Sequence, residues 1–256
     1  MSRTAAVLIG AMMFIAPVAA FSQNMPPTLM PAESEESSFT GVLDAFAFSQ
    51  YVWRGYEFNP ESVFQPYLRL NDAGFEVAAR GTLDFTDANG MKGEFSDYNL
   101  RAGMAKRTKM AEIALTYNYY GYRGERPKTQ ELALELAWGN PFFVGLDVYW
   151  DFDQADGFYA RLSTGFAWKA GFFSLIPSVS VGGATNKYLD YYFGVDSNSF
   201  CDLQVSLRAE AELATGIAIV AEGDYSELLT GDLREARKTF ARGDKFWWGG
   251  GVSLRF

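Results

Sequence analysis

The sequence contains 256 residues, of which 48% are hydrophobic, 16% aromatic and 21% charged, and its formal net charge at pH 7 is -9. A chain this apolar is not disordered, and a chain this charged is not a bundle of membrane helices, each of which needs roughly 20 consecutive apolar residues. The negative charge argues against a nucleic-acid partner, because such binding depends on neutralising phosphates.

The chain has no histidine and a single cysteine. The absence of histidine excludes Ser-His-Asp and Cys-His relays and imidazole zinc sites, and one cysteine cannot form an internal disulfide or a cysteine-rich metal cluster. A mechanism that uses carboxylates alone is conceivable, but pairs such as Glu210 and Glu212 belong to a generally acidic pattern. We therefore predict that the protein is not an enzyme and needs no metal or cofactor.

The first 38 residues have the features of targeting and leader sequence. A positive start at Arg3, an apolar run over 5–16 and small residues up to position 20 predict a secretory signal peptide over residues 1–20. Residues 21–38 hold three of the nine prolines and the acidic run ESEESS, which predicts a disordered periplasmic leader. A short plug helix over 25–30 is the alternative, which the adjacent prolines disfavour. Residues 39–256 remain for the folded domain.

From residue 41 to the C-terminus, apolar and polar residues alternate at every second position. The clearest case is 203–213, where Leu, Val and Ala occupy the odd positions and polar residues the even ones. This period is that of a β-strand with one apolar face. It predicts twelve strands, over residues 41–54, 63–71, 75–85, 96–105, 111–120, 130–138, 143–152, 157–168, 172–182, 200–213, 217–226 and 245–256.

The apolar faces of these strands are too extensive for the interior of a soluble sandwich or barrel. If they face lipid instead, every strand fits, and closure of the sheet satisfies the backbone hydrogen bonds. The sequence therefore predicts an all-β fold, a transmembrane antiparallel up-and-down β-barrel of about 12 strands in the bacterial outer membrane. In the first strand two registers compete. Asp44 and Gln50 favour the one in which residues 43, 45, 47, 51 and 53 face outward.

The connections between the predicted strands alternate in length. Those after even-numbered strands are short, such as 139–141 and 214–216, and most of those after odd-numbered strands are long, such as 183–199 and 227–244. Bacterial barrels have short periplasmic turns and longer outer loops. We therefore expect both ends of the barrel sequence on the periplasmic side.

The high aromatic content fits this architecture, because Trp, Tyr and Phe prefer the two membrane–water interfaces. Aromatic residues gather near both ends of the outward faces, and Leu, Val, Ala and Ile lie between them. The predicted lipid-facing girdle includes Phe75, Tyr98, Trp138, Trp150, Trp168, Trp248 and Phe256.

Several short motifs carry a family likeness. The stretch 51–55 (YVWRG) followed by Gln65-Pro66, the loop 191–196 (YYFGVD) and the closing strand from 246–249 (FWWG) to Phe256 resemble the TorF-like family of outer-membrane porins. The resemblance spans most of the chain beyond the signal peptide. It implies a channel, and it supplies no substrate and no catalytic residue. The final SLRF also resembles the C-terminal signal by which the barrel-assembly machinery recognises outer-membrane proteins.

The inward faces hold fourteen acidic and seven basic residues, which gives the lumen a formal charge of -7. A narrow acidic lumen concentrates cations and excludes anions. In the alternative, the charged groups pair across strands and plug the lumen; the surplus of acids favours the open pore. The predicted pore-lining residues are Glu76, Arg80, Asp84, Asp97, Arg101, Glu112, Glu131, Glu135, Asp147, Asp151, Arg161, Arg208, Glu210, Glu222 and Asp224.

We therefore predict an outer-membrane channel for passive diffusion of ions or small hydrophilic solutes, with a preference for cations. A non-transporting structural or adhesive barrel with a plugged lumen is the alternative. The expected partners are outer-membrane lipid, small polar solutes and, through Phe256, the barrel-assembly machinery. Five basic residues in the last outer loop, over 234–245, either pair with lipopolysaccharide phosphates or form a solvated run of charge.

Three smaller features add to this interpretation. The tyrosines of loop 183–199 either stack on a sugar or a base, or fold inward as a constriction, which we favour. Asp151, Asp153 and Asp156 resemble part of a calcium loop, but they lack its glycine and its closing glutamate, so a solvated loop is the better interpretation. Cys201 is expected to be a packed thiol.

Overall fold

The computed structural model describes residues 39–108, 110–124, 126–240 and 246–256. The predicted signal peptide (1–20), the predicted leader (21–38) and Lys245 lie outside these residues.

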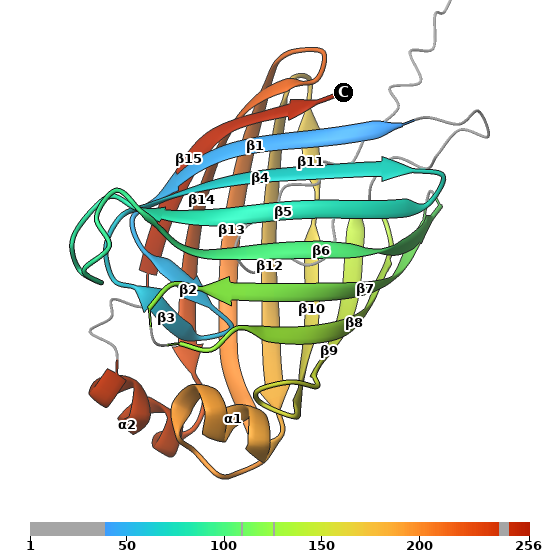
Figure 1. The fold of residues 1–256 in the computed structure, drawn as a ribbon. Helices are drawn as coiled ribbons and strands as arrows, with labels where there is room; N and C mark the ends of the chain where they lie inside the picture. The colour runs from blue at the N-terminus through green and yellow to red at the C-terminus, as the bar shows by residue number, and fades with distance from the viewer. Residues whose placement is uncertain (1–38, 109, 125, 241–245) are drawn as a thin grey trace, which may run out of the picture.

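One antiparallel sheet closes on itself to form the wall of the molecule (Figure 1). Consecutive strands of the wall pair with each other, with β1 next to β4 and β10 next to β12, and β15 pairs with β1, so the described residues form a closed barrel of twelve strands. The short strand β11 (Trp168–Ala170) continues β10 along the same partner, β12. The wall strands are β1 (Thr40–Phe48), β4 (Val63–Asp72), β5 (Phe75–Asp84), β6 (Phe95–Arg107), β7 (Ala111–Tyr122), β8 (Thr129–Trp138), β9 (Phe142–Asp151), β10 (Gly157–Phe166), β12 (Phe173–Ala184), β13 (Ser199–Ala214), β14 (Ile217–Leu228) and β15 (Phe246–Arg255).

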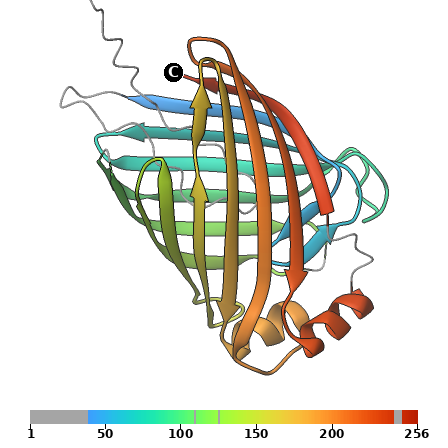
Figure 2. The same cartoon turned by 180° about the vertical axis from the view of Figure 1, so that it is seen from behind.

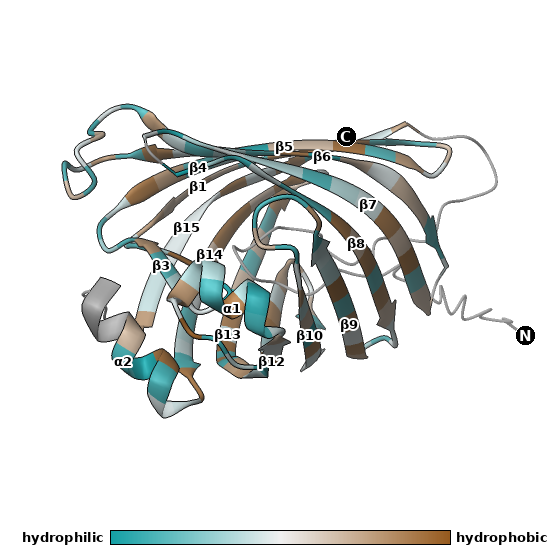
Figure 3. Ribbon diagram, turned by 60° about the horizontal axis from the view of Figure 1, so that its bottom comes forward, coloured by the Kyte–Doolittle hydropathy of each residue, from teal (hydrophilic) through white to brown (hydrophobic). Residues whose placement is uncertain are grey.

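The predicted fold class is confirmed, and eleven of the twelve strands end within two residues of their predicted limits. The strands are predictable because successive side chains of a strand point to opposite faces, one toward the surroundings and one toward the interior. On β13, Leu207 is 49% exposed whereas its neighbour Ser206 is 6% exposed. Hydrophilic and hydrophobic bands accordingly follow one another along the ribbons in Figure 3.

The prediction for the first strand is wrong beyond Phe48. β1 ends there, and after a bend at 49–50 the chain forms a separate two-stranded hairpin of β2 (Tyr51–Trp53) and β3 (Tyr56–Asn59). The two turn residues, Arg54 and Gly55, both have positive φ, at 51° and 75°. Such a two-residue turn matches the twist of a hairpin and reverses the chain tightly.

The preferred register of the first strand is correct for β1 and wrong for β2. Leu43, Ala45 and Ala47 face outward as expected, whereas Tyr51 and Trp53 are buried. Apolar residues resume at Tyr51 directly after the two polar residues of the bend, so the pattern does not show that the chain leaves the wall.

Two of the long connections, expected as loops, contain helices. They are α1 (Asn186–Phe193) and α2 (Gly231–Phe240). Gly194 ends α1 in the left-handed conformation, and its N–H donates to the carbonyl oxygen of Asp190 at 2.8 Å. Glycine is suited to this position because it has no Cβ to clash there.

Both helices lie at one end of the barrel, and the C-terminus lies at the other (Figures 1 and 2). We call these the loop end and the terminal end. In the usual orientation of bacterial barrels, the loop end faces the cell exterior. Among the residues that the structure describes, neither helix is long and apolar enough to span a membrane.

Candidate functional site

The outward face of the barrel is apolar and ringed with aromatic side chains. The structure places all seven predicted girdle residues on this face, where each is at least 40% exposed. They are Phe75, Tyr98, Trp138, Trp150, Trp168, Trp248 and Phe256. This is the distribution that lipid contact requires.

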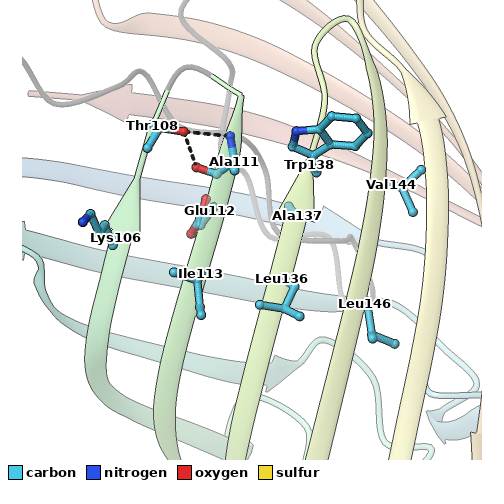
Figure 4. A pocket seen from close by; sticks show the side chains of 10 residues that line it. All are labelled: Lys106, Thr108, Ala111, Glu112, Ile113, Leu136, Ala137, Trp138, Val144 and Leu146. Atoms are coloured by element: carbon cyan, nitrogen blue, oxygen red, sulfur yellow. Dashed lines mark hydrogen bonds between the residues drawn. The ribbon is translucent and has the colours of Figure 1, made fainter.

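The outward face also bears a groove of about 440 Å³ near the terminal end, over β6 to β9 (Figure 4). Its lining is mostly apolar, and includes Ile113, Leu136, Trp138 and Leu146. It opens on the side that carries the girdle residues, and its lining also includes Glu112 of the inward face.

The structure places every predicted pore-lining residue on the inward face. Fourteen of the fifteen are buried, and Arg80 is half-buried. A side chain that lines a wide water-filled pore stays accessible to water, so burial at these positions means that the lumen is narrow and closely packed. The buried residues are Glu76, Asp84, Asp97, Arg101, Glu112, Glu131, Glu135, Asp147, Asp151, Arg161, Arg208, Glu210, Glu222 and Asp224.

Sequence reasoning missed two interior bases, Arg54 and Arg107. Arg54 lies in the turn of the hairpin, and Arg107 is the last residue of β6, two positions beyond the predicted end of that strand. Arg107 could have been identified from the alternation, because it lies six residues after Arg101 and therefore on the same inward face of the strand. No periodic signal identifies Arg54, because the turn has none.

Toward the terminal end, the interior carries a belt of ion pairs. Arg101 binds Glu76 at 2.9 Å and Glu135 at 2.6 Å, and Arg107 binds Glu76 at 2.7 Å and Glu112 at 2.9 Å. We call these five residues the ion-pair belt. Planar guanidinium groups suit it because each presents several donors at fixed angles.

A second group of ion pairs lies on the other side of the lumen, on β13 to β15. Arg208 lies 3.4 Å from Glu222, and Arg255 lies 2.7 Å from Glu210. Together with the ion-pair belt, these contacts are the cross-strand pairing that the plugged-barrel alternative expects.

Toward the loop end, three interior acids accept hydrogen bonds from neutral donors. Thr129 donates to Asp151 at 2.8 Å, Tyr159 donates to Asp202 at 3.1 Å, and Ser206 donates to Asp224 at 2.5 Å. The negative charge of the lumen is therefore concentrated toward the loop end.

The hairpin and α1 fill the loop end of the lumen with aromatic side chains. The Trp53 ring packs 5.6 Å from that of Tyr120 on the wall and 5.4 Å from that of Tyr192 on α1, and Tyr56 packs 5.7 Å from Phe193. We call β2, β3 and α1 together the plug. Figure 3, which brings this end forward, shows α1 and β3 at the barrel opening.

Arg54, in the turn of the hairpin, makes several contacts inside the barrel. It forms two hydrogen bonds with Glu131, at 2.7 and 3.0 Å, and one with the Tyr188 hydroxyl at 2.9 Å. Burial by itself lowers the pKa of Arg54, but the Glu131 carboxylate more than compensates and raises it well above the usual value. Burial also raises the pKa of Tyr188. At neutral pH the guanidinium is therefore charged and the phenol is protonated.

The smaller expectations have mixed outcomes. Tyr188 and Tyr192 fold inward and are buried, as the constriction interpretation expected, and Cys201 is buried. Asp151 is buried within the wall, whereas Asp153 and Asp156 are exposed. In the part of the chain that the structure describes, no three His, Cys, Asp or Glu side chains are arranged to hold a metal ion. Of the five basic residues in the last outer loop, only the side chain of Arg234 is described, and it is exposed.

A closed antiparallel barrel with an apolar, aromatic-ringed exterior and a charged interior defines an integral outer-membrane protein of the porin type. A comparison of the sequence with known families identifies the family of this barrel. The family model described as MltA-interacting protein MipA matches residues 9–233, and the chain belongs to this family. This membership and the barrel fit the predicted outer-membrane location. No curated protein matches the sequence.

Solved porins have a similar fold at low sequence identity. The KdgM porin superposes with a TM-score of 0.53 and 9% identity, covering 84% of this chain and 99% of its own. The NanC porin gives a TM-score of 0.53 and 11% identity, covering 83% of this chain and 98% of its own. The comparisons thus support a porin-like outer-membrane barrel, and they do not confirm the TorF-like label.

Proposed function

We propose that the protein is a porin-type channel with a preference for cations, and that the plug closes its outer end in the structure. The observation that carries the proposal is the charge of the interior, where fourteen buried carboxylates stand against six buried guanidinium groups and the half-buried Arg80 and Arg255 among the described residues. Low-dielectric walls focus the field of such an excess along the lumen. A cation is therefore stabilised inside the barrel, and an anion is repelled.

The plug is the element whose movement opens the proposed channel. Its hairpin forms its own two-stranded sheet and, within the described residues, shares no strand pairing with the wall. Side-chain contacts hold it in place, including hydrogen bonds of 2.8 Å from Arg80 to Tyr51 and from Arg126 to Tyr56. Displacing it breaks no backbone ladder of the barrel, so the wall can stay intact while the lumen opens.

The similarity to KdgM does not extend to its ligand. One structure of that porin is described as a complex with oligogalacturonate. Oligogalacturonate carries a carboxylate on each sugar, and the surplus of interior acids in the present barrel would repel it. Small cations and small neutral solutes fit the interior charge better.

Planar-bilayer recording in a KCl gradient tests the proposal. The purified wild-type protein is compared with a variant in which residues 51–59 are replaced by a short Gly-Ser linker. We expect small currents from the wild type, larger currents from the variant, and a reversal potential of cation sign in both. An absence of current from the linker variant, or a reversal potential of anion sign, would contradict the proposal.

A charge variant tests the origin of the selectivity. Asp202 is buried near the loop end, whereas Asp87 lies in an exposed loop of the same end. In the linker background, Asp202→Asn should move the reversal potential toward zero, and Asp87→Asn should leave it unchanged. Equal shifts from the two variants would mean that the interior acids do not set the selectivity.

The ion pairs and the family description favour a second function, that of a non-transporting barrel that binds a partner. We propose MltA as that partner, on the strength of the family's description as MltA-interacting. The test is binding of purified MltA to this barrel in lipid nanodiscs, with KdgM in nanodiscs as the control barrel. Specific binding with no current from the linker variant would favour this function, and equal binding to both barrels would exclude it.

A further inference from the structure

The surroundings of the Arg54 guanidinium form a complete recognition site. Its carbon Cζ lies 4.1 Å from the centre of the Trp53 ring, 3.9 Å from that of Tyr149 and 4.7 Å from that of Tyr159. Glu131 accepts its two parallel hydrogen bonds at the edge. The cation is thus stacked on aromatic faces and paired at its rim, which are the two interactions that suit a guanidinium.

Most of this site belongs to the barrel and not to the hairpin. Glu131, Tyr149 and Tyr159 lie on β8, β9 and β10, and Tyr188 lies on α1. We call these four residues the guanidinium box. If the hairpin moves away, Arg54 and Trp53 leave with it, whereas the three wall residues of the box remain on their strands.

Further contacts hold the box in shape. The Tyr120 hydroxyl donates to Glu131 Oε2 at 3.0 Å, and the Tyr159 hydroxyl donates to Asp202 Oδ1 at 3.1 Å. None of these hydrogen-bonding side chains, which belong to Tyr120, Glu131, Tyr159 and Asp202, lies on the hairpin. The orientation of the box therefore does not depend on Arg54 alone, and such preorganisation lowers the cost of binding a ligand.

The geometry selects a guanidinium over an ammonium. Two parallel N–H groups match the two oxygens of Glu131, and a flat cation can stack on Tyr149 while it makes that pair. An ammonium is a compact, strongly hydrated point charge, and it cannot make both contacts in the same way.

We infer that the guanidinium box is a binding site for solutes that carry a guanidinium group, and that Arg54 occupies it as an internal ligand when the plug is closed. The inference deepens the proposed function and rests on it in one respect, because an external solute reaches the box only when the hairpin of the plug moves. A tethered group competes at an effective concentration on the order of millimolar or higher. External guanidinium solutes therefore bind the wild type weakly.

Removal of Arg54 exposes the box to a chosen probe. The atoms that Arg54→Ala deletes beyond Cβ are those of ethylguanidinium, which is used as the chloride salt; ethylammonium chloride is the matched control. Binding to the full-length protein in detergent is measured by isothermal titration calorimetry. We expect ethylguanidinium to bind this variant at least about tenfold more tightly than ethylammonium, a ratio that one charge-assisted hydrogen bond can supply. It should also bind the wild type more weakly than the variant.

A second substitution locates the site. In the double variant Arg54→Ala and Glu131→Gln, ethylguanidinium should lose its advantage over ethylammonium, because the paired carboxylate is gone. Retention of that advantage in the double variant, equal binding of the two cations to Arg54→Ala, or no binding at all would overturn the inference.

Arg54→Lys covers the case in which Arg54→Ala does not fold. It keeps the positive charge, and ethylguanidinium should displace the lysine at lower concentrations than it displaces the wild-type arginine; equal concentrations would overturn the inference. Calorimetry does not require ion flow. Binding without current would therefore contradict the channel proposal alone, and current without selective binding would contradict the guanidinium box alone.

Discussion

Arg101 on β6 reaches past β7 and forms two hydrogen bonds with Glu135 on β8, at 2.7 and 2.6 Å. The contact ties together two strands that share no backbone ladder. Because Arg101 also binds Glu76 on β5, one guanidinium joins carboxylates from both sides of its own strand. The ion-pair belt thus braces the wall from within, in addition to the hydrogen bonds between adjacent strands.

Arg101→Met should destabilise the barrel by about 3 to 5 kcal/mol, because it leaves two buried carboxylates without their shared cation. The matched control is Arg123→Met. Arg123 pairs with Glu94 at 2.8 Å, but the two side chains are 58% and 48% exposed, so that loss should be about 0 to 1 kcal/mol. Urea unfolding in lipid vesicles measures both, and similar losses from the two variants would contradict the bracing role.

The contact between Arg54 and Glu131 should make closure of the plug insensitive to alkaline pH. The pKa of Arg54 is raised above its unfolded value, so its stabilising effect is complete below the unfolded pKa and is lost only as pH rises through the higher folded one. A lysine has an unperturbed pKa of about 10.4 and loses its charge at lower pH.

The variant Arg54→Lys should therefore lose stability relative to the wild type as pH rises above about 10, where lysine begins to lose its charge. The difference between the thermal unfolding midpoints of the two proteins measures this effect, because other groups titrate equally in both. Parallel curves across this range would show that the charge at position 54 does not stabilise the plug.

Leu207 is an outward residue in the middle of β13. Leu207→Arg should cost about 2 to 4 kcal/mol, because a charged side chain is placed near the midplane of the bilayer. Leu207→Ile keeps an apolar side chain in lipid and is the control, expected to be close to neutral. Unfolding in vesicles reports both values, and tolerance of the arginine would mean that position 207 does not face lipid.

Gly249 on β15 permits close packing against β1. A Cβ added there would lie 2.6 Å from the backbone oxygen of Ala47, so Gly249→Ala should cost about 1 to 3 kcal/mol through overpacking. At Gly223 an added Cβ would meet Phe246 at 3.7 Å, which is ordinary contact, and Gly223→Ala is the control. An equal effect of the two variants on stability would argue against the observed approach of β15 to β1.

Phe256 tests the expected link to the barrel-assembly machinery. Its backbone exchanges two hydrogen bonds with Gly41, at 2.6 and 3.0 Å, and its ring lies 6.4 Å from that of Phe39. Phe256→Ala keeps the backbone bonds, so a fall in the amount of protein in the outer membrane, without loss of stability after refolding in vitro, would support recognition of the side chain. Unchanged amounts in cells would contradict it.

The wall and its inward face follow directly from the period-two pattern, because the same alternation that makes a strand also assigns its faces. Glu76, Arg101 and Glu135 were predicted to share the interior for this reason, and the structure places them there in direct contact. The pattern does not predict which base each acid pairs with, because contacts across β7 depend on the curvature of the barrel and not on any one strand.

The plug illustrates the opposite case. Tyr51 and Trp53 continue the alternation of the first strand, yet they turn into the lumen after the bend at 49–50. The alternation has the same appearance whether an apolar side chain meets lipid or an aromatic interior. Helix α1 was missed because its apolar residues pack against the hairpin of the plug, and a short helix is stabilised by such tertiary packing more than by its own sequence.

The two halves of the lumen hold their acids differently. Guanidinium groups neutralise Glu76, Glu112 and Glu135 toward the terminal end, whereas hydroxyl groups hold Asp151 and Asp202 toward the loop end. A conduit charged mainly at one mouth offers cations a different barrier from each side. If the barrel conducts as proposed, it should act as a rectifier: its current should depend on the sign of the applied voltage, with equal salt on both sides.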